Sequence, residues 1–453
     1  MTDAIDLYTQ RPGEAVAPPT RLAGRIKHLG PSIIVSGSIV GSGEILLTSS
    51  LGAQAGFVLL WWVLVSCWSK SIVQAEITRY VITSGDTYLR ALNRLPGRIP
   101  GPWGPFSWPI GLGLLAFVPG VLGLSGIIGS AGQALQLLVD IDPIIATATI
   151  SLGTILVLGT GTYLRIERAM LVFVISFTVL TIVCAVLMQF TEYRMTLDDV
   201  KSGFTFEFPT EYFVIALAMY GYTGVNSGET AAYTYWCVEK GYPSYIGPDR
   251  DDPEWVARAK GWIKVLHTDV WVTLVLLTLA TLPFYFLGAG VLHRLGQNPE
   301  GLETIRVLSS MFTETLGAWS LWVFGVGAFF ILFSTVLSAI GAGGRFIPEY
   351  LIELGIIDRA NVRRKLWIRG YVLVIPVLSF VLYMTFQNPV VLVTIGAITA
   401  ALFLPIQSGA TLWLQRHHMD QRVRPSRPMY IALWSVFVFQ CVMALAVIRY
   451  VVF

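Results

Sequence analysis

The chain has 453 residues, of which 54% are hydrophobic and only 13% are charged, and its formal net charge is +3. A soluble protein of this length would form about three domains with a much larger share of charged side chains. The composition therefore excludes a soluble protein and favours one that lies in a lipid bilayer. The small net charge gives no reason to expect a nucleic-acid partner.

Apolar stretches of about 20 residues, enough to cross a hydrocarbon layer of about 30 Å, recur along the chain. The first 22 residues are polar, contain three prolines and lack an apolar core, so we expect a flexible cytosolic tail and no signal peptide. We predict eleven membrane-spanning helices, at residues 29–51, 56–81, 107–137, 142–163, 168–190, 212–238, 265–289, 317–343, 366–386, 388–414 and 428–451.

The basic residues indicate the orientation of these spans, because loops rich in Lys and Arg stay in the cytosol. If the N-terminus is cytosolic, 25 of the 31 basic residues fall in cytosolic segments. Loops on the other side, such as 191–211, are acidic instead. This alternation supports both the eleven spans and a cytosolic N-terminus.

The four cysteines lie far apart in or beside apolar segments, without a CxxC pair or a cluster of histidines. A disulfide or a cysteine-based metal site is therefore not expected, and we expect no cofactor. No set of nucleophile, base and orienting residue stands out in the sequence. A receptor or an enzyme embedded in lipid is accordingly the weakest hypothesis.

An internal repeat relates the two halves of the chain. The triplet Ser-Gly-Glu at 42–44, in span 1, returns at 227–229, in span 6, which is 185 residues or five spans later. Because five is odd, the second copy must cross the membrane in the opposite direction. We predict an all-α membrane protein with an inverted five-plus-five repeat and discontinuous helices 1 and 6. The first repeat covers 23–190, the second 191–414, and residues 415–453 hold the eleventh helix.

Glu44 and Glu229 are the only two of the 28 acidic residues that we expect deep in a span. A carboxylate at the bilayer centre costs roughly 2.5 to 3.5 kcal/mol, so such residues are usually functional. The glycines beside them allow the helices to unwind and free backbone carbonyls. Two structural alternatives remain: the glycines serve only close helix packing, or the glutamates pair with a buried basic residue, for which Lys70 in span 2 is the candidate.

The residues at the two breaks form an oxygen-rich set. Carboxylate, amide and hydroxyl oxygens suit hard ions such as Mg²⁺, and neither break contains Met, Cys or His. Magnesium loses its water reluctantly, so we expect a roomy site for a partly hydrated ion. The predicted metal site consists of Gly41, Ser42, Glu44, Thr223, Asn226, Ser227 and Glu229.

Proton coupling would require titratable groups arranged as a relay. Span 3 has no ionisable residue between Phe106 and Val139, and the five histidines fall near span ends or in loops. We therefore expect passive uptake that is not coupled to protons, although either glutamate could itself carry a proton.

At these residues the chain resembles the NRAMP family of divalent-metal transporters, whose LeuT-type fold has two inverted five-helix repeats and an eleventh helix. The resemblance covers most of the chain. It rests on the broken spans, on Leu-Gly-Pro at 29–31 and on Thr-Ser-Gly-Asp at 83–86. It implies a membrane transporter with a divalent cation as its substrate, and we expect a monomer.

Both metal-binding motifs depart from the family pattern. The family carries Asp-Pro-Gly-Asn in span 1 and Met-Pro-His-Asn in span 6, where this chain has Gly-Ser-Gly-Glu at 41–44 and Asn-Ser-Gly-Glu at 226–229. The chain is thus similar to the NRAMP-related magnesium transporters, a prokaryotic branch with a larger and harder site and no proton coupling. This resemblance implies import of Mg²⁺, with Mn²⁺ as a second possibility, by alternating access across the cytoplasmic membrane of a prokaryote.

A permease for amino acids or organic cations, of the same fold, is the alternative. Gly-Ser-Gly in a broken first helix also occurs in such proteins. Their sites expose the N–H groups of a helix N-terminus to a substrate carboxylate. Two glutamates beside such a site would repel that carboxylate, so we favour the cation.

Overall fold

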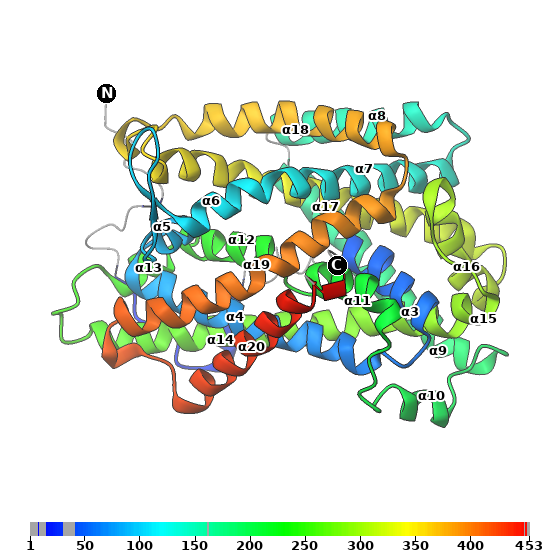
Figure 1. Ribbon diagram of the computed structural model, residues 1–453, viewed down its shortest axis with the longest axis horizontal. Helices are drawn as coiled ribbons and strands as arrows, with labels where there is room; N and C mark the ends of the chain where they lie inside the picture. Colours follow the sequence, from blue (N-terminus) through cyan, green and yellow to red (C-terminus); the bar gives the residue numbers. More distant parts are fainter. Residues whose placement is uncertain (1–7, 9–14, 30–40, 161–162, 448, 451–453) are drawn as a thin grey trace.

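The computed structural model describes residue 8 and residues 15–29, 41–160, 163–447 and 449–450. Long helices lie side by side along the longest axis of the molecule (Figure 1). In the described residues only two short strands occur, β1 (Arg98–Ile99) and β2 (Phe106–Ser107), which pair antiparallel. The protein is therefore a helical bundle.

The long helices follow the predicted spans. In chain order they are η1 (Gly43–Thr48) with α3 (Ser49–Ala55), α4 (Leu60–Ser84), α6 (Trp108–Leu115) with α7 (Phe117–Leu138), α8 (Pro143–Gly159), α9 (Tyr163–Leu187), α11 (Phe213–Tyr222) with α12 (Ser227–Glu239), α14 (Trp255–Leu287) with η4 (Gly288–Leu292), α17 (Ser320–Glu353), α18 (Arg364–Phe386), α19 (Pro389–His417) and α20 (Arg427–Val447). The connections hold the short helices α1 (Leu22–Lys27), α5 (Tyr88–Asn93), α10 (Leu197–Ser202), α13 (Tyr242–Ile246), α15 (His293–Leu295) and α16 (Thr304–Leu316), and the 3-10 turns η2 (Met188–Phe190), η3 (Thr210–Tyr212), η5 (Gly301–Glu303), η6 (Arg359–Asn361) and η7 (Gln421–Val423).

Seven helices of the described chain are long and apolar enough to cross a membrane by themselves. Three other predicted spans are not long and apolar enough, each for its own reason. The α8 helix is apolar but has only 17 residues. The α4 helix carries Lys70 and two more charged residues, and span 6 is divided into two helices. Of span 1, residue 29 and residues 41–51 are described, so residues 30–40, with most of its Leu-Gly-Pro motif, lie outside the described residues. Most of the predicted tail, 1–22, lies outside them too.

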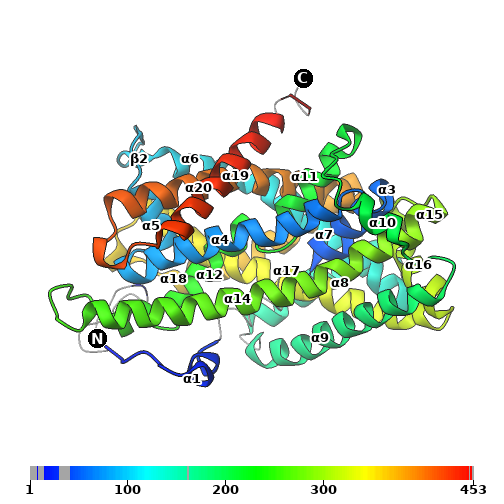
Figure 2. The same ribbon diagram turned by 90° about the horizontal axis from the view of Figure 1, so that it is seen from below.

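The short connecting helices gather at the two ends of the bundle. α10, α15 and α16 lie at one end and α5 at the other in both views (Figures 1 and 2), and α13 lies near α5 in Figure 1. We call these the α16 end and the α5 end. The connections that the sequence predicts on the outside are therefore separated from those that it predicts in the cytosol.

Two apolar clusters stabilise the two ends of the bundle. One contains η1, α3, α11 and the second half of α14, with Ile45 and Phe284 fully buried. The other contains the second half of α4, α5, α12 and the first half of α14, with Val225 and Trp262 fully buried. The interruption of span 6 falls where these clusters meet.

Candidate functional site

Span 6 is interrupted at residues 223–226. α11 ends at Tyr222 and α12 begins at Ser227. Between them Gly224 has a φ of 74°, in the left-handed region that favours glycine. The Asn226 side chain accepts a hydrogen bond from the Glu229 N–H (2.8 Å), and Glu229 Oε2 accepts one from the Asn226 N–H (3.0 Å). This capping box begins α12 and holds both side chains at its N-terminus.

Glu229 presents its charge to a cavity. Its side chain is partly exposed and lines that cavity. Within the described chain its second oxygen, Oε1, has no hydrogen-bond partner. The positive end of the α12 dipole favours a negative charge at this position. The carboxylate can therefore bind a cation without breaking the hydrogen bond that begins the helix.

Glu44 lies in η1, a π-helical turn, and its side chain is fully buried. Oε2 accepts a hydrogen bond from the Gly41 N–H (3.0 Å). Oε1 accepts from the Gly224 N–H (3.2 Å) and from the Thr281 hydroxyl (3.4 Å). The carboxylate thus joins spans 1, 6 and 7. It is not one of the residues that line the cavity and lies behind the cavity wall.

Two other predicted site residues, Gly41 and Thr223, also lie behind that wall. The N–H of Gly41 is used by Glu44. Thr223 Oγ1 is 2.8 Å from Oγ1 of Thr48, and the Thr223 carbonyl accepts a hydrogen bond from Lys70. These groups fix the shape of the two breaks in the observed conformation.

A cavity of about 330 Å³ lies beside both breaks. Residues of α7, α17 and α19 form most of the remaining wall, and the cavity reaches Tyr88 in α5 and Tyr350 near the end of α17. It therefore extends from the breaks toward the α5 end. At the breaks it is lined by Ser42, Gly43, Asn226, Ser227, Gly228 and Glu229. Four of the seven predicted site residues meet on this one cavity.

The cavity wall is mainly apolar, with a small set of polar side chains. Of the described residues that line it, Glu229 is the only Asp, Glu, His, Lys or Arg, and none is Met or Cys. The polar groups at the breaks are hydroxyl, amide and carboxylate oxygens. Such a wall offers hard oxygen ligands and one negative charge to whatever enters.

On the side of the breaks that faces the α16 end, the backbones of α3 and η4 lie too close together to leave room for side chains. A Cβ added to Gly52 in α3 would lie 2.7 Å from the Ala289 nitrogen, and one added to Gly288 would lie 2.4 Å from the Ser49 carbonyl oxygen. The backbones of α3 and η4 therefore touch. The protein is tightly packed on this side of the breaks.

Gln407 in α19 is a functional candidate that was not predicted from the sequence. Its Nε2 donates hydrogen bonds to the Ser227 carbonyl (2.8 Å) and to the Tyr88 hydroxyl (2.6 Å). Its Oε1 is buried and has no partner in the described chain. The signal was present, because an amide in the middle of a mainly apolar span must find polar partners.

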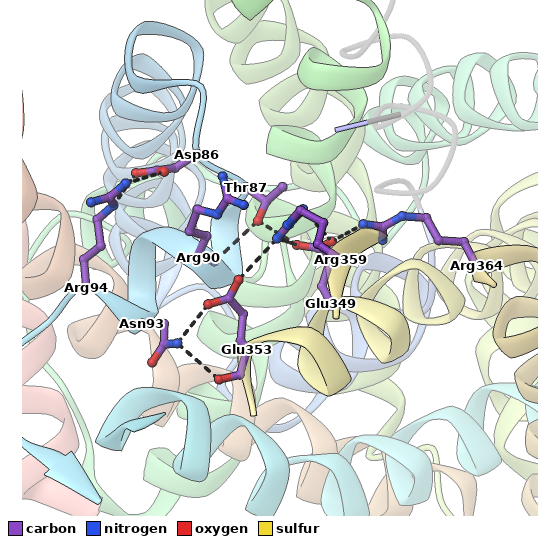
Figure 3. A network of polar contacts seen from close by, with 9 residues as sticks. All are labelled: Asp86, Thr87, Arg90, Asn93, Arg94, Glu349, Glu353, Arg359 and Arg364. Atoms are coloured by element: carbon purple, nitrogen blue, oxygen red, sulfur yellow. Dashed lines mark hydrogen bonds and ion pairs between the residues drawn. The ribbon is translucent and has the colours of Figure 1, made fainter. Parts of the chain in front are cut away.

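Three further carboxylates are fully buried, Glu76, Asp269 and Glu349. Their hydrogen-bond partners are Arg79 and Gln415 for Glu76, Tyr233 for Asp269, and Thr87, Arg359 and Arg364 for Glu349. Figure 3 shows the Glu349 group beside the ion pair of Asp86 with Arg94. These carboxylates accept hydrogen bonds from other side chains, whereas the only hydrogen-bond partner of the Glu229 carboxylate among the described residues is the backbone N–H of Asn226.

No ready-made metal cluster exists in the part of the chain that the structure describes, where no three His, Cys, Asp or Glu side chains come together. Nor does an ion pair join Lys70 to Glu44 or Glu229 among those residues. A cation at the breaks must therefore use one or two carboxylates, neutral oxygens and water.

A family model described as "Natural resistance-associated macrophage protein-like" matches residues 32–449, almost the whole chain. The chain belongs to the NRAMP family. This confirms the family predicted from the broken spans, and NRAMP proteins are transporters of divalent metals, not enzymes. No curated protein matches the sequence of this NRAMP protein.

Solved structures share its fold at low sequence identity. The Eremococcus coleocola manganese transporter, in a crystal structure of one of its mutants, has a TM-score of 0.68 at 15% identity, and the alignment covers 96% of this chain and 89% of that one. MhsT in complex with L-phenylalanine has a TM-score of 0.58 at 16% identity, with 96% and 99% covered. Mhp1, a nucleobase-cation-symport-1 family transporter, has 0.57 at 15%, with 96% and 95% covered. The predicted LeuT-type membrane fold is thus confirmed.

Proposed function

We propose that this NRAMP protein imports divalent cations, above all Mg²⁺, as partly hydrated ions and without proton coupling. The cation would bind to Glu229, Asn226, Ser42 and Ser227 at the two breaks. Glu44, Gly41 and Thr223 would shape the site from behind in the observed conformation, and Glu44 would approach the ion when the breaks rearrange.

The observation that carries this proposal is the carboxylate of Glu229 on a cavity whose described wall holds no Met, Cys or His. A hard ion such as Mg²⁺ prefers oxygen ligands, whereas sulfur and imidazole ligands favour later transition metals. The described cavity wall is mainly apolar, and the metal ligands that its side chains offer are all oxygen atoms. Manganese, which also accepts oxygen ligands, is the second candidate.

The size of the cavity supports a hydrated ion. Its volume is about 330 Å³, whereas a water molecule in the liquid occupies roughly 30 Å³. Several waters can therefore enter with the ion. Because Mg²⁺ usually keeps several waters and binds through one or two carboxylates, the sparse set of charged ligands matches its coordination habits.

The lack of a second carboxylate and of any histidine on the described wall supports uncoupled transport. Proton movement through a membrane protein requires a chain of titratable side chains, typically Asp, Glu and His. Among the described lining residues, only Glu229 is acidic and none is basic. The membrane potential would then drive the divalent cation inward by itself.

The same carboxylate argues against an amino-acid permease. In that case the N-terminus of α12 would bind the substrate carboxylate through free N–H groups. Glu229 already occupies this N-terminus and would repel a second carboxylate.

The position of the cavity, on one side of the two breaks, supports alternating access. The cavity extends toward the α5 end and the α3 and η4 backbones touch on the other side. We assign the α5 end to the cytosol, with the N-terminus inside, because the positively charged connections lie there. The structure would then represent an inward-facing state of a monomer in the cytoplasmic membrane of a prokaryote.

Reconstituted proteoliposomes test this function. With a negative potential inside, we expect Mg²⁺ influx without acidification, weaker or similar Mn²⁺ influx, and no uptake in protein-free vesicles. Dyes for the metal and for pH inside the same vesicles would record both. Absence of uptake of Mg²⁺, Mn²⁺ and Ca²⁺ would refute divalent transport, and acidification in step with Mg²⁺ influx would refute the uncoupled mechanism.

A further inference from the structure

Lys70 is a fully buried lysine in the middle of α4. Its Nζ donates hydrogen bonds to the backbone carbonyls of Tyr220 and Thr223, and it lies 5.0 Å from the centre of the Tyr220 ring. These carbonyls belong to the C-terminal end of α11, where helical carbonyls lack partners. The ammonium group therefore sits at the negative end of a half-helix.

The Thr223–Gly224 peptide is held between opposite charges. Its carbonyl, from Thr223, accepts a hydrogen bond from Lys70. Its N–H, from Gly224, donates one to Glu44 Oε1 at 3.2 Å. A positive charge at the oxygen and a negative charge at the N–H favour the same orientation of the peptide dipole. This orientation directs the Thr223 carbonyl to Lys70, and neither Thr223 nor Gly224 lines the cavity.

Burying the charges of Lys70 and Glu44 costs free energy unless the two charges offset each other. Lys70 and Glu44 are fully buried, and a charge deep in a membrane protein requires a partner of opposite sign or several hydrogen bonds. Lys70 and Glu44 are not in direct contact. Each charge instead binds one end of the Thr223–Gly224 peptide dipole, so the two charges stabilise each other through this peptide. Gly224 can take part because its φ of 74° costs little only in glycine.

We propose that Lys70 is a positioning residue of the transport site, an inference that rests on the proposed function. Lys70 offsets the charge of Glu44 through the Thr223–Gly224 peptide. Among the described residues of the cavity wall, Glu229 then remains as the one carboxylate whose charge is presented to the ion. A divalent ion leaves such a site more easily than one with two uncompensated carboxylates, because attraction grows with the product of the charges. Lys70 would thus favour turnover over tight binding.

Transport kinetics of Lys70→Met test this role. We expect the KM for Mg²⁺ uptake to fall roughly tenfold, since one opposing charge is removed from a poorly solvated site. The maximal rate should fall as well, because release slows. Gln74→Met is the matched control: Gln74 lies one turn further along α4, is fully buried, and its amide has no partner in the described chain. It should leave the KM unchanged. A Lys70→Met protein with an unchanged or higher KM would overturn the proposal.

Thermal unfolding without divalent ions tests the pairing independently of transport. Lys70→Met leaves Glu44 without its offsetting charge, so its Tm should fall by several degrees. The double variant Lys70→Met/Glu44→Gln should be more stable than Lys70→Met, and it should fold even if Lys70→Met cannot be purified. A double variant that is no more stable, or that fails to fold, would overturn the pairing.

The two measurements separate this inference from the proposed function. If the wild-type protein takes up no divalent ion, divalent transport fails, whereas the unfolding data still decide whether Lys70 and Glu44 are coupled. If wild-type uptake is robust and Lys70→Met behaves like Gln74→Met, only the role of Lys70 fails.

Discussion

The two breaks carry the same triplet, Ser-Gly-Glu, yet their glutamates differ in what they can do. Glu44 Oε2 and Glu229 Oε2 each accept a hydrogen bond from the N–H three residues earlier, at 3.0 Å in both cases. The local geometry is therefore repeated. The other oxygen is bound to Gly224 and Thr281 in the first case, and in the second it faces the cavity without a partner among the described residues.

This difference follows from the surroundings of the preceding glycine. A Cβ added to Gly43 would lie 2.7 Å from the Tyr222 carbonyl oxygen, whereas one added to Gly228 would approach only the Asn226 side chain, at 3.3 Å. The first break is thus packed against the second, and the second opens to the cavity. One copy of the motif therefore stabilises the contact between the two breaks, while the other presents its carboxylate to the cavity.

Gly43→Ala should have the largest effect. The new methyl group would collide with the backbone of the span 6 break, which cannot rotate aside. Overpacking of this kind costs about 3 kcal/mol or more when the neighbour is rigid. We expect loss of folded protein, measured by size-exclusion chromatography and thermal unfolding in detergent. Gly228→Ala is the control and should unfold at the wild-type temperature; equal damage from both substitutions would contradict the proposed asymmetry.

Glu229→Gln should mainly reduce Mg²⁺ uptake, whereas Glu44→Gln should mainly reduce stability. Glutamine can replace glutamate in a capping box, so Glu229→Gln should unfold like the wild type, yet lose most Mg²⁺ uptake with its charge. Glu44→Gln leaves a buried N–H or hydroxyl donor without an acceptor, which costs about 1 to 3 kcal/mol of stability. Thermal unfolding and vesicle uptake of both variants measure this crossover. Full uptake by Glu229→Gln would remove the central support for the cation site.

The sequence was sufficient to predict the fold, because the features that specify membrane spans can be recognised within short stretches of sequence. Apolar length, positive loops and the odd-numbered repeat predicted the spans, and the family match confirmed the resemblance. Helix ends were predicted less accurately: α4 ends at Ser84 and not at 81, because Gly85 in the left-handed region forms its C-cap.

The arrangement around the site depended on contacts that sequence does not encode locally. The repeat predicted that both glutamates lie at breaks, but it could not predict that Glu44 accepts a hydrogen bond from the Gly224 N–H and does not line the cavity. Gln407 was missed because its partners, Tyr88 and Ser227, come from distant spans. Such details follow from tertiary packing, which a helical periodicity does not specify.

Asn226→Ala should have the smallest of these effects and tests why the second break stays open. The substitution removes the acceptor for the Glu229 N–H, and loss of such a cap costs about 1 kcal/mol. It also frees Glu229 to adopt other rotamers, so we expect a several-fold higher KM for Mg²⁺ with a small decrease in Tm. Asn226→Ser, which retains a capping oxygen, should recover the Tm and part of the affinity. If Asn226→Ala changes neither quantity, the capping box does not hold Glu229 toward the cavity, and the contrast between the two breaks must arise from the packing of Gly43 alone.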